Sequence, residues 1–416
     1  MLSVAEAEQI VLTCIPILPA EDCPLIHAHG RVLRDTIKAD RPMPPFDRVT
    51  MDGFALHAAA VAGGRRQFRI RGMQGAGMMP LTLSSDEDCI EVATGAVLPV
   101  GADAVAPYEA TRRPAATTGK ASEATGAAPE VTLDGAEDIV AGRNIHARGS
   151  DHAAGDVLLS AGVRLGGGEI AVAAACGAAC VSVSMRPRIA VVATGDELVE
   201  VDAVELARHQ IRKSNDYALR AALLASGLTG QVDRFHFRDL RSEVETGLRR
   251  LLSEYEVLVV TGGVSKGRFD FLPEALAALG VAQKVRGVAQ RPGKPLWFGL
   301  SSRRTPVFAL PGNPVSAYTC LHRYVLPALA KMAGLPPPAP GCVELTQPVT
   351  FPAPLTHFLP VALAHTADAR RMAVPAPFNT SGDLGGLIGT DGFVELPAEQ
   401  AEFRAGSIAR FWPWTK

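Results

Sequence analysis

The stretch IAVVATGDEL, residues Ile189–Leu198, decides the expected fold of this chain. It leads a continuous apolar run into a Thr-Gly turn, and such a run is typical of a strand covered on both faces. Two later stretches repeat the arrangement, VLVVTGGVS at Val257–Ser265 and VFALPGNPVS at Val307–Ser316. Segments with apolar residues at helical spacing begin near Ser214 and near Ser242. Strands that alternate with helices predict a parallel α/β domain.

The sequence changes character on both sides of this α/β segment. Residues 1–40 predict a helix and a short extended segment, and residues 41–139 are rich in Gly, Pro and short β-type runs. Frequent turn signals follow between 140 and 183, and residues 342–416 predict an all-β region after a proline-rich linker. At 416 residues the chain exceeds one hydrophobic core, so we expect an α/β domain flanked by smaller β-rich domains.

Composition narrows the class of function. Lys+Arg at 41 and Asp+Glu at 43 leave a net charge of -2, which disfavours a nucleic-acid surface because such surfaces need clustered positive charge. No run approaches the ~20 apolar residues that a membrane span requires. The start of the chain carries a capping box at Ser3 and Glu6 and no basic segment before an apolar one, and the seven cysteines are scattered. We therefore expect a cytoplasmic protein with free thiols, no nucleic-acid partner and no membrane contact.

The turns that follow the three apolar runs indicate an anion-binding edge. Ligands of open α/β sheets lie outside the carboxyl ends of the strands. Glycines there let backbone N–H groups approach a phosphate, and Ser265 and Ser316 could add hydroxyl donors. The chain contains no GxxxxGK[ST] motif, and no GxGxxG follows a predicted strand. An ordinary P-loop ATPase and a nicotinamide dehydrogenase are therefore disfavoured.

Two further segments carry charge in stiff surroundings. The turn RPGKP at Arg291–Pro295 places two cations between prolines, which suits an oxyanion beside the sheet edge, although a solvated turn would look the same. The stretch from Pro44 to Gly53 holds Asp52 in apolar surroundings. By itself Asp52 is more often a turn-capping residue than a catalyst.

Taken together, these segments resemble the molybdopterin molybdenumtransferase family (MoeA-type), to which the C-terminal domain of gephyrin is related. The resemblance extends along nearly the whole chain, and the motifs occur in family order. They are Pro44–Asp47, Met51–Gly53, Thr94–Ala96, Gly101–Val105, Gly149–Asp151, Thr194–Leu198, Gly262–Ser265, Arg291–Pro295 and Leu310–Ser316.

The resemblance implies a multidomain fold of class α/β plus β, with an elongated subunit that forms a homodimer. Its implied parts are an N-terminal dimerisation subdomain (1–40 with 140–183), a β-rich inserted subdomain (41–139), a molybdopterin-binding parallel α/β domain (184–334) and a C-terminal β-domain (335–416). It implies a reaction in which adenylylated molybdopterin and molybdate give molybdenum cofactor and AMP, with Mg²⁺. The adenylylating enzyme and the molybdoenzymes that accept the cofactor are the implied protein partners.

The resemblance also assigns roles to residues. Asp270 is the first choice for the carboxylate that binds Mg²⁺, since this ion prefers oxygen ligands. The implied catalytic residues are Asp52, Thr94, Asp151, Glu197 and Asp270. The implied substrate-binding residues are Thr194, Gly195, Asp196, Ser214, Asn215, Gly262, Gly263, Ser265, Pro311, Gly312 and Asn313. The implied molybdate-binding residues are Arg291, Lys294, Pro295, Ser316 and Ser381.

The chain departs from the family pattern at several positions. Lys213 and Arg268 stand where relatives commonly carry acids, and Arg291 replaces a lysine. The segment Leu355–Val361 lacks an arginine that relatives often have, although Arg370 lies downstream with a second arginine. The two acid-to-base changes, Lys213 and Arg268, could weaken Mg²⁺ binding or replace a metal contact by a cation–phosphate contact. Lys213 could instead be a surface lysine without effect.

Three functions are therefore compared. The first is molybdenum insertion by an enzyme, which the retained acids favour. The second is a protein that binds molybdopterin or its cofactor for delivery without catalysis, which Lys213 and Arg268 favour. The third is a different nucleotide hydrolase on the same α/β domain, because a fold does not fix a function. The cationic turn and the motifs outside the α/β domain disfavour the third.

Overall fold

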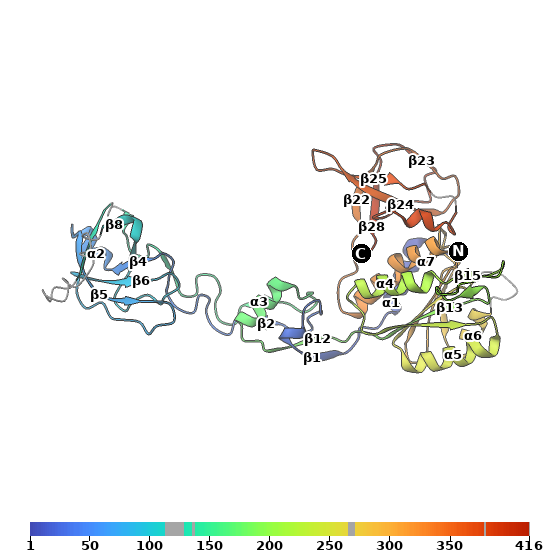
Figure 1. Ribbon diagram of the computed structural model, residues 1–416, viewed down its shortest axis with the longest axis horizontal. Helices are drawn as coiled ribbons and strands as arrows, with labels where there is room; N and C mark the ends of the chain where they lie inside the picture. Colours follow the sequence, from blue (N-terminus) through green and yellow to red (C-terminus); the bar gives the residue numbers. More distant parts are fainter. Residues whose placement is uncertain (113–128, 135–137, 265–270, 378–379, 416) are drawn as a thin grey trace. The chain divides into compact units, whose positions relative to one another are not determined.

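The computed structural model describes residues 1–112, 129–134, 138–264, 271–377 and 380–415. The chain forms two compact units (Figure 1). Unit 1 comprises Met1–Asp35, Ala161–Ile170 and Cys180–Lys416, and unit 2 comprises Thr36–Ser160 and Ala171–Ala179. Unit 1 thus contains the predicted α/β and C-terminal segments together, and the four-part division stays a prediction.

A six-stranded sheet forms the centre of unit 1. Its order is β16-β13-β17-β21-β20-β18. The first four strands run parallel, β20 is antiparallel to β21, and β18 is antiparallel to β20. The strands are β13 (Ile189–Thr194), β16 (Val232–Phe237), β17 (Val257–Thr261), β18 (Ala282–Arg286), β20 (Trp297–Leu300) and β21 (Pro306–Leu310). The three strands predicted from apolar runs, β13, β17 and β21, are adjacent in the sheet. The parallel α/β domain is confirmed.

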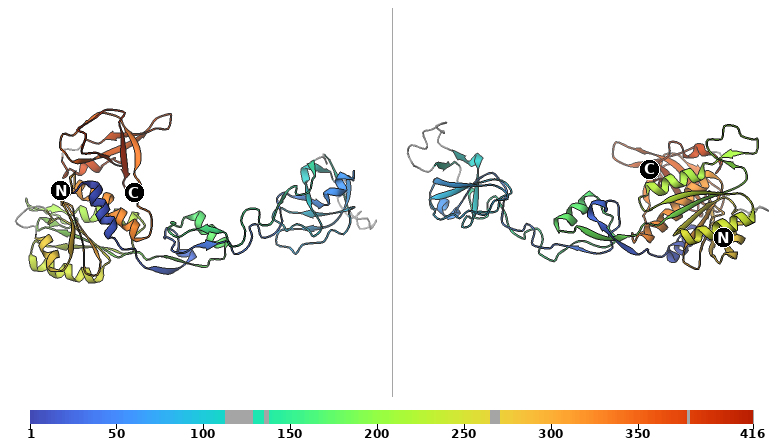
Figure 2. Two further views of the ribbon diagram at one scale, coloured as in Figure 1. Left: turned by 180° about the vertical axis from the view of Figure 1, so that it is seen from behind. Right: turned by 60° about the horizontal axis from the view of Figure 1, so that its bottom comes forward.

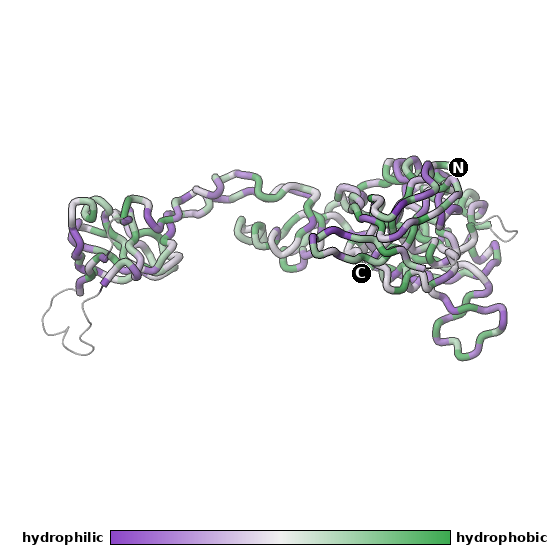
Figure 3. Tube along the Cα trace, turned by 90° about the horizontal axis from the view of Figure 1, so that it is seen from above, coloured by the Kyte–Doolittle hydropathy of each residue, from purple (hydrophilic) through white to green (hydrophobic). Residues whose placement is uncertain are grey.

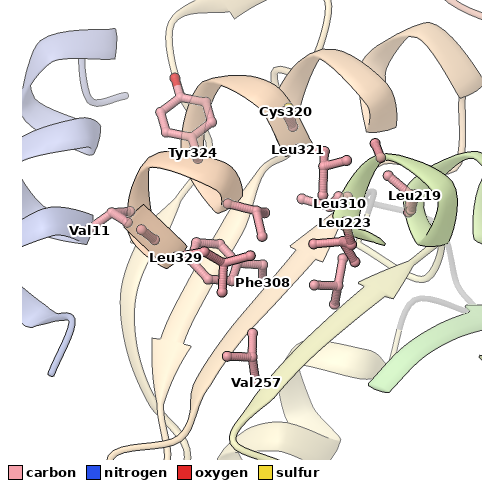
Figure 4. Close-up of a cluster of buried hydrophobic side chains, with 14 of the residues drawn as sticks. Val11, Leu219, Leu223, Val257, Phe308, Leu310, Cys320, Leu321, Tyr324 and Leu329 are labelled. Carbon is pink, nitrogen blue, oxygen red and sulfur yellow. The ribbon is translucent and has the colours of Figure 1, made fainter. Parts of the chain in front are cut away.

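Helices cover both faces of this sheet, as the colours of Figure 2 also show. One face contacts α1 (Val4–Cys14), α4 (Asn215–Ala225), α7 (Pro314–Cys320), the π-helical turn η4 (Leu321–Val325) and α8 (Leu326–Met332); the other contacts α5 (Arg241–Glu254) and α6 (Leu272–Ala278). Alternate residues of a strand point to opposite faces. Accordingly, Val257 packs with α4 and α8 in the core of Figure 4, whereas Leu258 packs on the α5 side. This two-sided burial explains the continuous apolar runs.

The C-terminal region of unit 1 forms a closed sheet. Its order is β19-β24-β25-β22-β28-β26, and an additional β24–β26 pairing closes the last five strands into a barrel. The strands are β19 (Gln290–Arg291), β22 (Gly341–Leu345), β24 (Thr356–His365), β25 (Arg371–Pro375), β26 (Gly392–Leu396) and β28 (Ile408–Pro413), beside the pair β23 (Val349–Thr350) and β27 (Glu402–Phe403). Because β19 comes from the cationic turn and pairs with β24, the barrel is joined to the α/β domain at that turn.

Unit 2 contains another six-stranded sheet, in the order β7-β4-β6-β5-β9-β8. Its elements are β4 (Gly53–Leu56), α2 (Ala58–Ala62), β5 (Gln67–Gln74), β6 (Asp88–Val92), β7 (Ala104–Pro107), η2 (Tyr108–Ala110), β8 (Thr111–Arg112) and β9 (Glu130–Leu133). Two apolar clusters fill its two sides, around Phe54 and around Ile90. The β-rich character predicted for this region is confirmed.

Short strand pairs and turns complete both units. Unit 1 also has η1 (Leu25–His27), η5 (Leu384–Leu387), the pair β1 (Ala20–Pro24) and β12 (Cys180–Ser184), and the pair β14 (Leu198–Val199) and β15 (Ile211–Arg212). Unit 2 also pairs β2 (Ile37–Lys38) with β11 (Val157–Leu159), and β3 (Arg48–Val49) with β10 (Ile145–His146). The helix α3 (Gly167–Ala175) begins within the glycine triplet Gly166–Gly168.

The capping box, the cysteines and the hydropathy of the chain were also predicted from the sequence. The capping box at α1 is present, because Ser3 Oγ accepts from Glu6 N at 3.2 Å and Glu6 Oε2 accepts from Ser3 N at 2.8 Å. All seven cysteines are free, and three of them are buried. Hydrophilic residues interrupt the hydrophobic ones along the trace in Figure 3. Among the described residues, no helix combines the length and the apolar character that crossing a bilayer would need.

Candidate functional site at the carboxyl edge of the α/β sheet

The loops after β13, β17 and β21 come together at one edge of the sheet in unit 1. The N–H of Gly262 donates to the carbonyl of Leu310 at 3.1 Å, which ties the β17 loop to the end of β21. Thr261 Oγ1 donates to the carbonyl of Pro311 at 3.2 Å. Parallel strands in register place their carboxyl ends side by side, so the glycine loops predicted from three separate segments form one surface.

Glycine is required in this surface where the backbone takes a positive φ. Gly262 has φ +95°, and a Cβ there would lie 2.7 Å from Thr194 Oγ1 and 2.8 Å from the Thr194 carbonyl oxygen. Gly195 has φ +140°, and a side chain there would collide with the Glu197 carboxylate. Residues with a Cβ rarely adopt these conformations. Glycine at position 262 therefore lets the loop after β17 lie against the end of β13, and glycine at position 195 leaves room for the Glu197 carboxylate.

Asn215, at the start of α4, joins two of these loops. Its Nδ2 donates to Thr261 Oγ1 at 3.0 Å and to the carbonyl of Gly312 at 2.7 Å. The preceding residue, Ser214, is the N-cap of α4, although its side chain makes no capping hydrogen bond. The Asn215 amide thus connects the loops after β17 and β21. The Ser214 hydroxyl, at the amino end of the helix, is available to bind a ligand.

Two cavities open at this edge and share lining residues. The first, the Glu197 cavity, has about 360 Å³, and the second, the Ser214 cavity, has about 470 Å³. Both are lined by Thr194, Glu197, Gly262, Gly312 and Asn313; the Glu197 cavity adds Gly195, Asp239, Gly263, Val264, Pro295 and Pro311, and the Ser214 cavity adds Lys213, Ser214, Asn215 and Gly382 among others. Together they offer a cleft with room for an extended ligand.

Most residues predicted to bind substrate line these two cavities. Asp196 is different, because neither cavity has it in its lining and its Oδ1 accepts from the N–H of Asp239 at 3.2 Å. Ser265, Asp270 and Arg268 lie outside the described residues. The roles of all these residues stay predictions.

Asp239 is an acidic lining residue that the sequence reasoning missed. It follows β16, whose sequence VDRFHF alternates apolar and polar residues instead of forming a continuous apolar run, because β16 is at the edge of the sheet. In the Glu197 cavity it stands with the Glu197 carboxylate. Two carboxylates on a cavity lined by glycine loops supply the oxygen ligands that suit Mg²⁺. Within the described ranges, no cluster of three His, Cys, Asp or Glu residues could hold a metal ion.

Lys213 is buried in the lining of the Ser214 cavity, with 6% of its surface exposed. Its Nζ donates to Glu200 Oε1 at 2.5 Å, and this hydrogen bond is the main cause that lowers the pKa of Glu200. The reading of Lys213 as a surface lysine is therefore wrong. A buried ammonium needs a charged partner, and Glu200 supplies it from the loop after β14.

The residues predicted to bind molybdate lie in different places. Pro295 lines the Glu197 cavity, and Arg291 and Ser381 line a third cavity of about 370 Å³, here called the Arg291 cavity. Lys294 is exposed, whereas Ser316 is buried on α7 and lines none of the three cavities. The Ser381 hydroxyl accepts from Asn313 Nδ2 at 2.8 Å. Ser381 therefore connects the Arg291 cavity with the cleft of the sheet edge.

In unit 2, Asp52 and Thr94 are paired. Asp52 Oδ1 accepts from the N–H of Thr94 at 2.6 Å and from its hydroxyl at 2.9 Å. The backbone hydrogen bond, followed by the side-chain one, holds the pKa of Asp52 below its usual value. The carboxylate is exposed, so the turn-capping interpretation accounts for one oxygen, and Oδ2 has no hydrogen-bond partner among the residues that the structure describes.

Asp151, also in unit 2, is held by a histidine. Its Oδ1 lies 2.8 Å from His146 Nε2, and this hydrogen bond lowers the pKa of Asp151. His146 Nδ1 lies 3.0 Å from Arg48. Asp151 is thus one end of a polar chain across β10 and β3, and it is exposed like Asp52.

Comparison with known protein families covers most of the chain. The MoeA N-terminal region (domain I and II) matches residues 2–177, a probable molybdopterin binding domain matches residues 190–331, and the MoeA C-terminal region (domain IV) matches residues 343–414. The second match spans β13 to α8, which includes most of the residues that line the cleft described above. The order of the three matches is the order of the motifs noted in the sequence.

Individual relatives agree with this assignment. A molybdopterin molybdenumtransferase from Synechocystis sp. is 39% identical over 415 residues, covering 100% of both chains. One from Staphylococcus epidermidis is 31% identical over 385 residues, covering 91% of this chain and 87% of the relative. The crystal structure of a molybdopterin biosynthesis MoeA protein from Pyrococcus horikosii superposes with a TM-score of 0.80 at 28% identity, covering 100% and 99% of the two chains. The resemblance seen in the motifs is thereby confirmed: the chain belongs to the molybdopterin molybdenumtransferase (MoeA) family.

Proposed function

We propose that this protein inserts molybdenum into molybdopterin, taking adenylylated molybdopterin and molybdate to molybdenum cofactor and AMP. The observation that carries this proposal is the cleft at the carboxyl edge of the sheet, where three glycine loops from β13, β17 and β21 meet. Backbone N–H groups at such an edge are suited to phosphate groups. Relatives named for this transferase activity match the chain over its full length, which supports the same reaction here.

In this proposal the substrate extends through both cavities. The two phosphates of the phosphoanhydride, one from molybdopterin and one from the adenylyl group, lie against the loops of Gly262 and Gly312, and Ser214 donates its hydroxyl at the start of α4. Asn215 orients the loops through its two hydrogen bonds and keeps their N–H groups facing the cleft. A preorganised set of donors stabilises charge that develops on phosphate oxygens without further rearrangement.

Mg²⁺ is the proposed metal of the reaction. Glu197 and Asp239, which line one cavity, would hold it together with Asp270, which follows the β17 loop in the sequence. When bound, the ion would supply positive charge to the phosphate oxygens at which the phosphoanhydride breaks. Asp270→Ala is expected to abolish turnover while binding of the pterin persists, and equal turnover would remove Asp270 from the mechanism.

Molybdate is proposed to bind between the cationic turn and Ser381. Arg291 supplies a planar guanidinium that can donate two hydrogen bonds to an oxyanion, and Lys294 adds a point charge. Lys294→Ala should raise the molybdate concentration needed for half-maximal AMP release. An unchanged requirement would show that the anion binds elsewhere.

We further propose a homodimer in which Asp52 and Thr94 of one subunit act at the sheet edge of the other. This arrangement can be tested by mixing two inactive variants, Asp52→Asn and Asp270→Ala. If each site draws on two subunits, half of the dimers are mixed and one of their two sites is intact, so about a quarter of wild-type activity should return. Mixing the Asp270→Ala and Glu197→Ala proteins is the control, because both changes lie on the sheet-edge side of the site and no activity should return.

The decisive experiment measures AMP release from adenylylated molybdopterin by the purified protein with Mg²⁺, with and without molybdate. AMP release that depends on molybdate, with a product that activates an apo-molybdoenzyme, supports the enzyme. A parallel series with tungstate tests which oxyanion is used. If the protein binds no pterin, the proposal is wrong.

Lys213 favours a second candidate, a protein that binds molybdopterin for delivery without catalysis. It brings a buried cation into the cleft where relatives commonly have an acid, although Glu200 neutralises it. Tight pterin binding without AMP release would support this candidate. The variant Lys213→Asp distinguishes the readings: an increased Mg²⁺ affinity would show that position 213 faces the metal. Weaker substrate binding instead would show that Lys213 contacts a phosphate.

The proposed cellular location and protein partners follow from the proposed reaction. We expect a cytoplasmic protein whose partners are the adenylylating enzyme and the molybdoenzymes that accept the cofactor. Fractionation of cells and co-purification with the adenylylating enzyme test this expectation. Recovery in a membrane fraction would contradict it.

A further inference from the structure

The Arg291 cavity lies in unit 1 where the cationic turn meets the C-terminal barrel. It is lined by Arg291, Pro292, Pro348, Val349, Thr350, Phe351, His357, Leu359, Pro375, Ala376, Pro377 and Ser381. The strand β19 carries Arg291 and pairs with β24, which places Arg291 opposite His357 in the register. The cavity therefore combines one permanent cation, one histidine and two hydroxyl groups on an otherwise apolar wall.

The His357 ring is fixed in the cavity wall. It stacks on the Phe351 ring at a centroid distance of 4.1 Å and an interplanar angle of 20°. Its Nδ1 is buried and makes no hydrogen bond to any described residue. The guanidinium of Arg291 lies 5.9 Å from the centroid of the same Phe351 ring. A buried ring nitrogen without a partner is costly unless a ligand satisfies it.

We propose that His357 contacts the oxyanion in the Arg291 cavity and takes up one proton from water as a tetrahedral dianion binds. This inference rests on the proposed molybdate-binding role of Arg291 and Ser381 and adds a residue to it. Arg291 contributes fixed charge, the hydroxyl of Ser381 or Thr350 contributes a neutral hydrogen bond, and His357 contributes charge only when the anion is present.

The electrostatic surroundings of His357 determine whether binding of the anion favours or opposes protonation of its ring. Burial, and then the charge of Arg291, lower the pKa of His357 to about 4, so the ring is neutral in the ligand-free protein near neutral pH. The strand β26 places Leu396 opposite His357, and the neighbouring segment contributes Pro348, Val349, Thr350 and Phe351, none of which titrates. Among the described residues that line this cavity, Arg291 is thus the charged group.

A bound dianion favours the protonated form of the His357 ring, whereas the ligand-free cavity favours the neutral form. It offsets the Arg291 charge and favours imidazolium, so binding raises the pKa of His357 and protons are taken up. By linkage, the dianion must then bind more tightly as pH falls through the pKa of the bound state. Between about pH 8 and about pH 6 we expect the Kd for molybdate to fall by about tenfold.

Calorimetric titration of the full-length protein with molybdate, and with tungstate, tests the inference. Runs in two buffers of different ionisation enthalpy give the number of protons taken up at each pH. We expect proton uptake and a pH-dependent Kd in the wild type, and neither in His357→Gln. The variant His357→Phe keeps the ring stacking but lacks a polar atom, so it should also lose proton uptake if the fold is intact by thermal unfolding.

The matched control is His365→Gln, which changes an exposed histidine on the same strand β24 and should leave proton uptake unchanged. Arg291→Ala should weaken binding at every pH. Proton uptake that persists in both His357 variants, or a wild type that binds neither anion, overturns the inference. AMP release separates it from the proposed reaction: proton-coupled anion binding without AMP release would leave the His357 inference intact and refute the enzyme.

Discussion

The two groups of proposed catalytic side chains are held in different ways. Glu197 in unit 1 belongs to a loop whose path is set by Gly195, Gly262 and the buried strands β13 and β17. Asp52 in unit 2 is exposed, and two hydrogen bonds from Thr94 fix one of its oxygens. At the sheet edge, the shape of the backbone makes the site. In unit 2, individual polar contacts orient a carboxylate on a stable scaffold.

This difference determines at which residues a chemical role can be tested without disturbing the fold. At the sheet edge, a substitution at Gly262 should disturb the backbone and the cleft together, since this position lies against Thr194 without spare room. In unit 2, a carboxylate can be replaced by an amide of equal size without loss of packing. Asp52 is therefore the better position for isolating a chemical role.

The largest effect is expected for Gly262→Ala. A Cβ at this position collides with Thr194 and the φ of +95° is strained for alanine, so we expect turnover to fall by about 10³-fold or more. The matched control is Gly312→Ala, whose Cβ would meet only the Gly262 Cα at 3.8 Å. Steady-state AMP release measures both. Similar losses in the two variants would show that strain at Gly262 is not the cause.

Asp52→Asn is expected to lower kcat by about 10²-fold while the melting temperature stays the same, because the amide keeps the contact with Thr94 but loses the charge. Asp103→Ala is the structural counterpart in the same unit, since Asp103 Oδ1 accepts from the N–H of Ala58 at 2.7 Å and alanine removes this acceptor. It should lower the melting temperature and leave kcat unchanged. The reverse pattern would contradict the division between scaffold and chemistry.

Asn215→Ala is expected to raise KM by about tenfold, because two hydrogen bonds between α4 and the loops are lost. The effect should appear in KM more than in kcat, since Asn215 positions the loops that bind substrate. Asn144→Ala serves as a comparison in unit 2, where Asn144 Nδ2 donates to the carbonyl of Val105. A kcat loss as large as that of Asp52→Asn would place Asn215 at the reacting atoms instead.

The smallest effect concerns the pH dependence of Asp52. Its lowered pKa keeps the carboxylate charged as pH falls, so Thr94→Val should raise this pKa and move the acid limb of kcat to higher pH. The shift should be modest because the backbone N–H of Thr94, the larger cause, remains. Carboxyl NMR titration of Asp52 measures the shift of its pKa. The control is Ser150→Ala, which removes a hydroxyl beside Asp151 and should leave the titration of Asp52 unchanged. An unchanged Asp52 titration would contradict this account.

Much of the α/β core could be predicted because strands that are buried on both faces have continuous apolar sequences. The runs at β13, β17 and β21 are apolar throughout, and the glycines after them mark the edge. The strands β16 and β18, at the two edges of the sheet, were missed because strands with an exposed side carry polar residues. The short apolar strand β20 was missed as well. With β16, the cleft residue Asp239 that follows it was missed as well.

The sequence by itself determined the family, the order of the domains and the glycine loops, because these depend on local periodicity and on motifs that stay contiguous in the chain. Only the tertiary structure decided which charges meet. It paired Lys213 with Glu200 and brought Arg291 to His357 on the strand β24. Such pairs join separate segments of the chain, and the energy of a charge depends on burial and on its partner, neither of which a linear pattern contains.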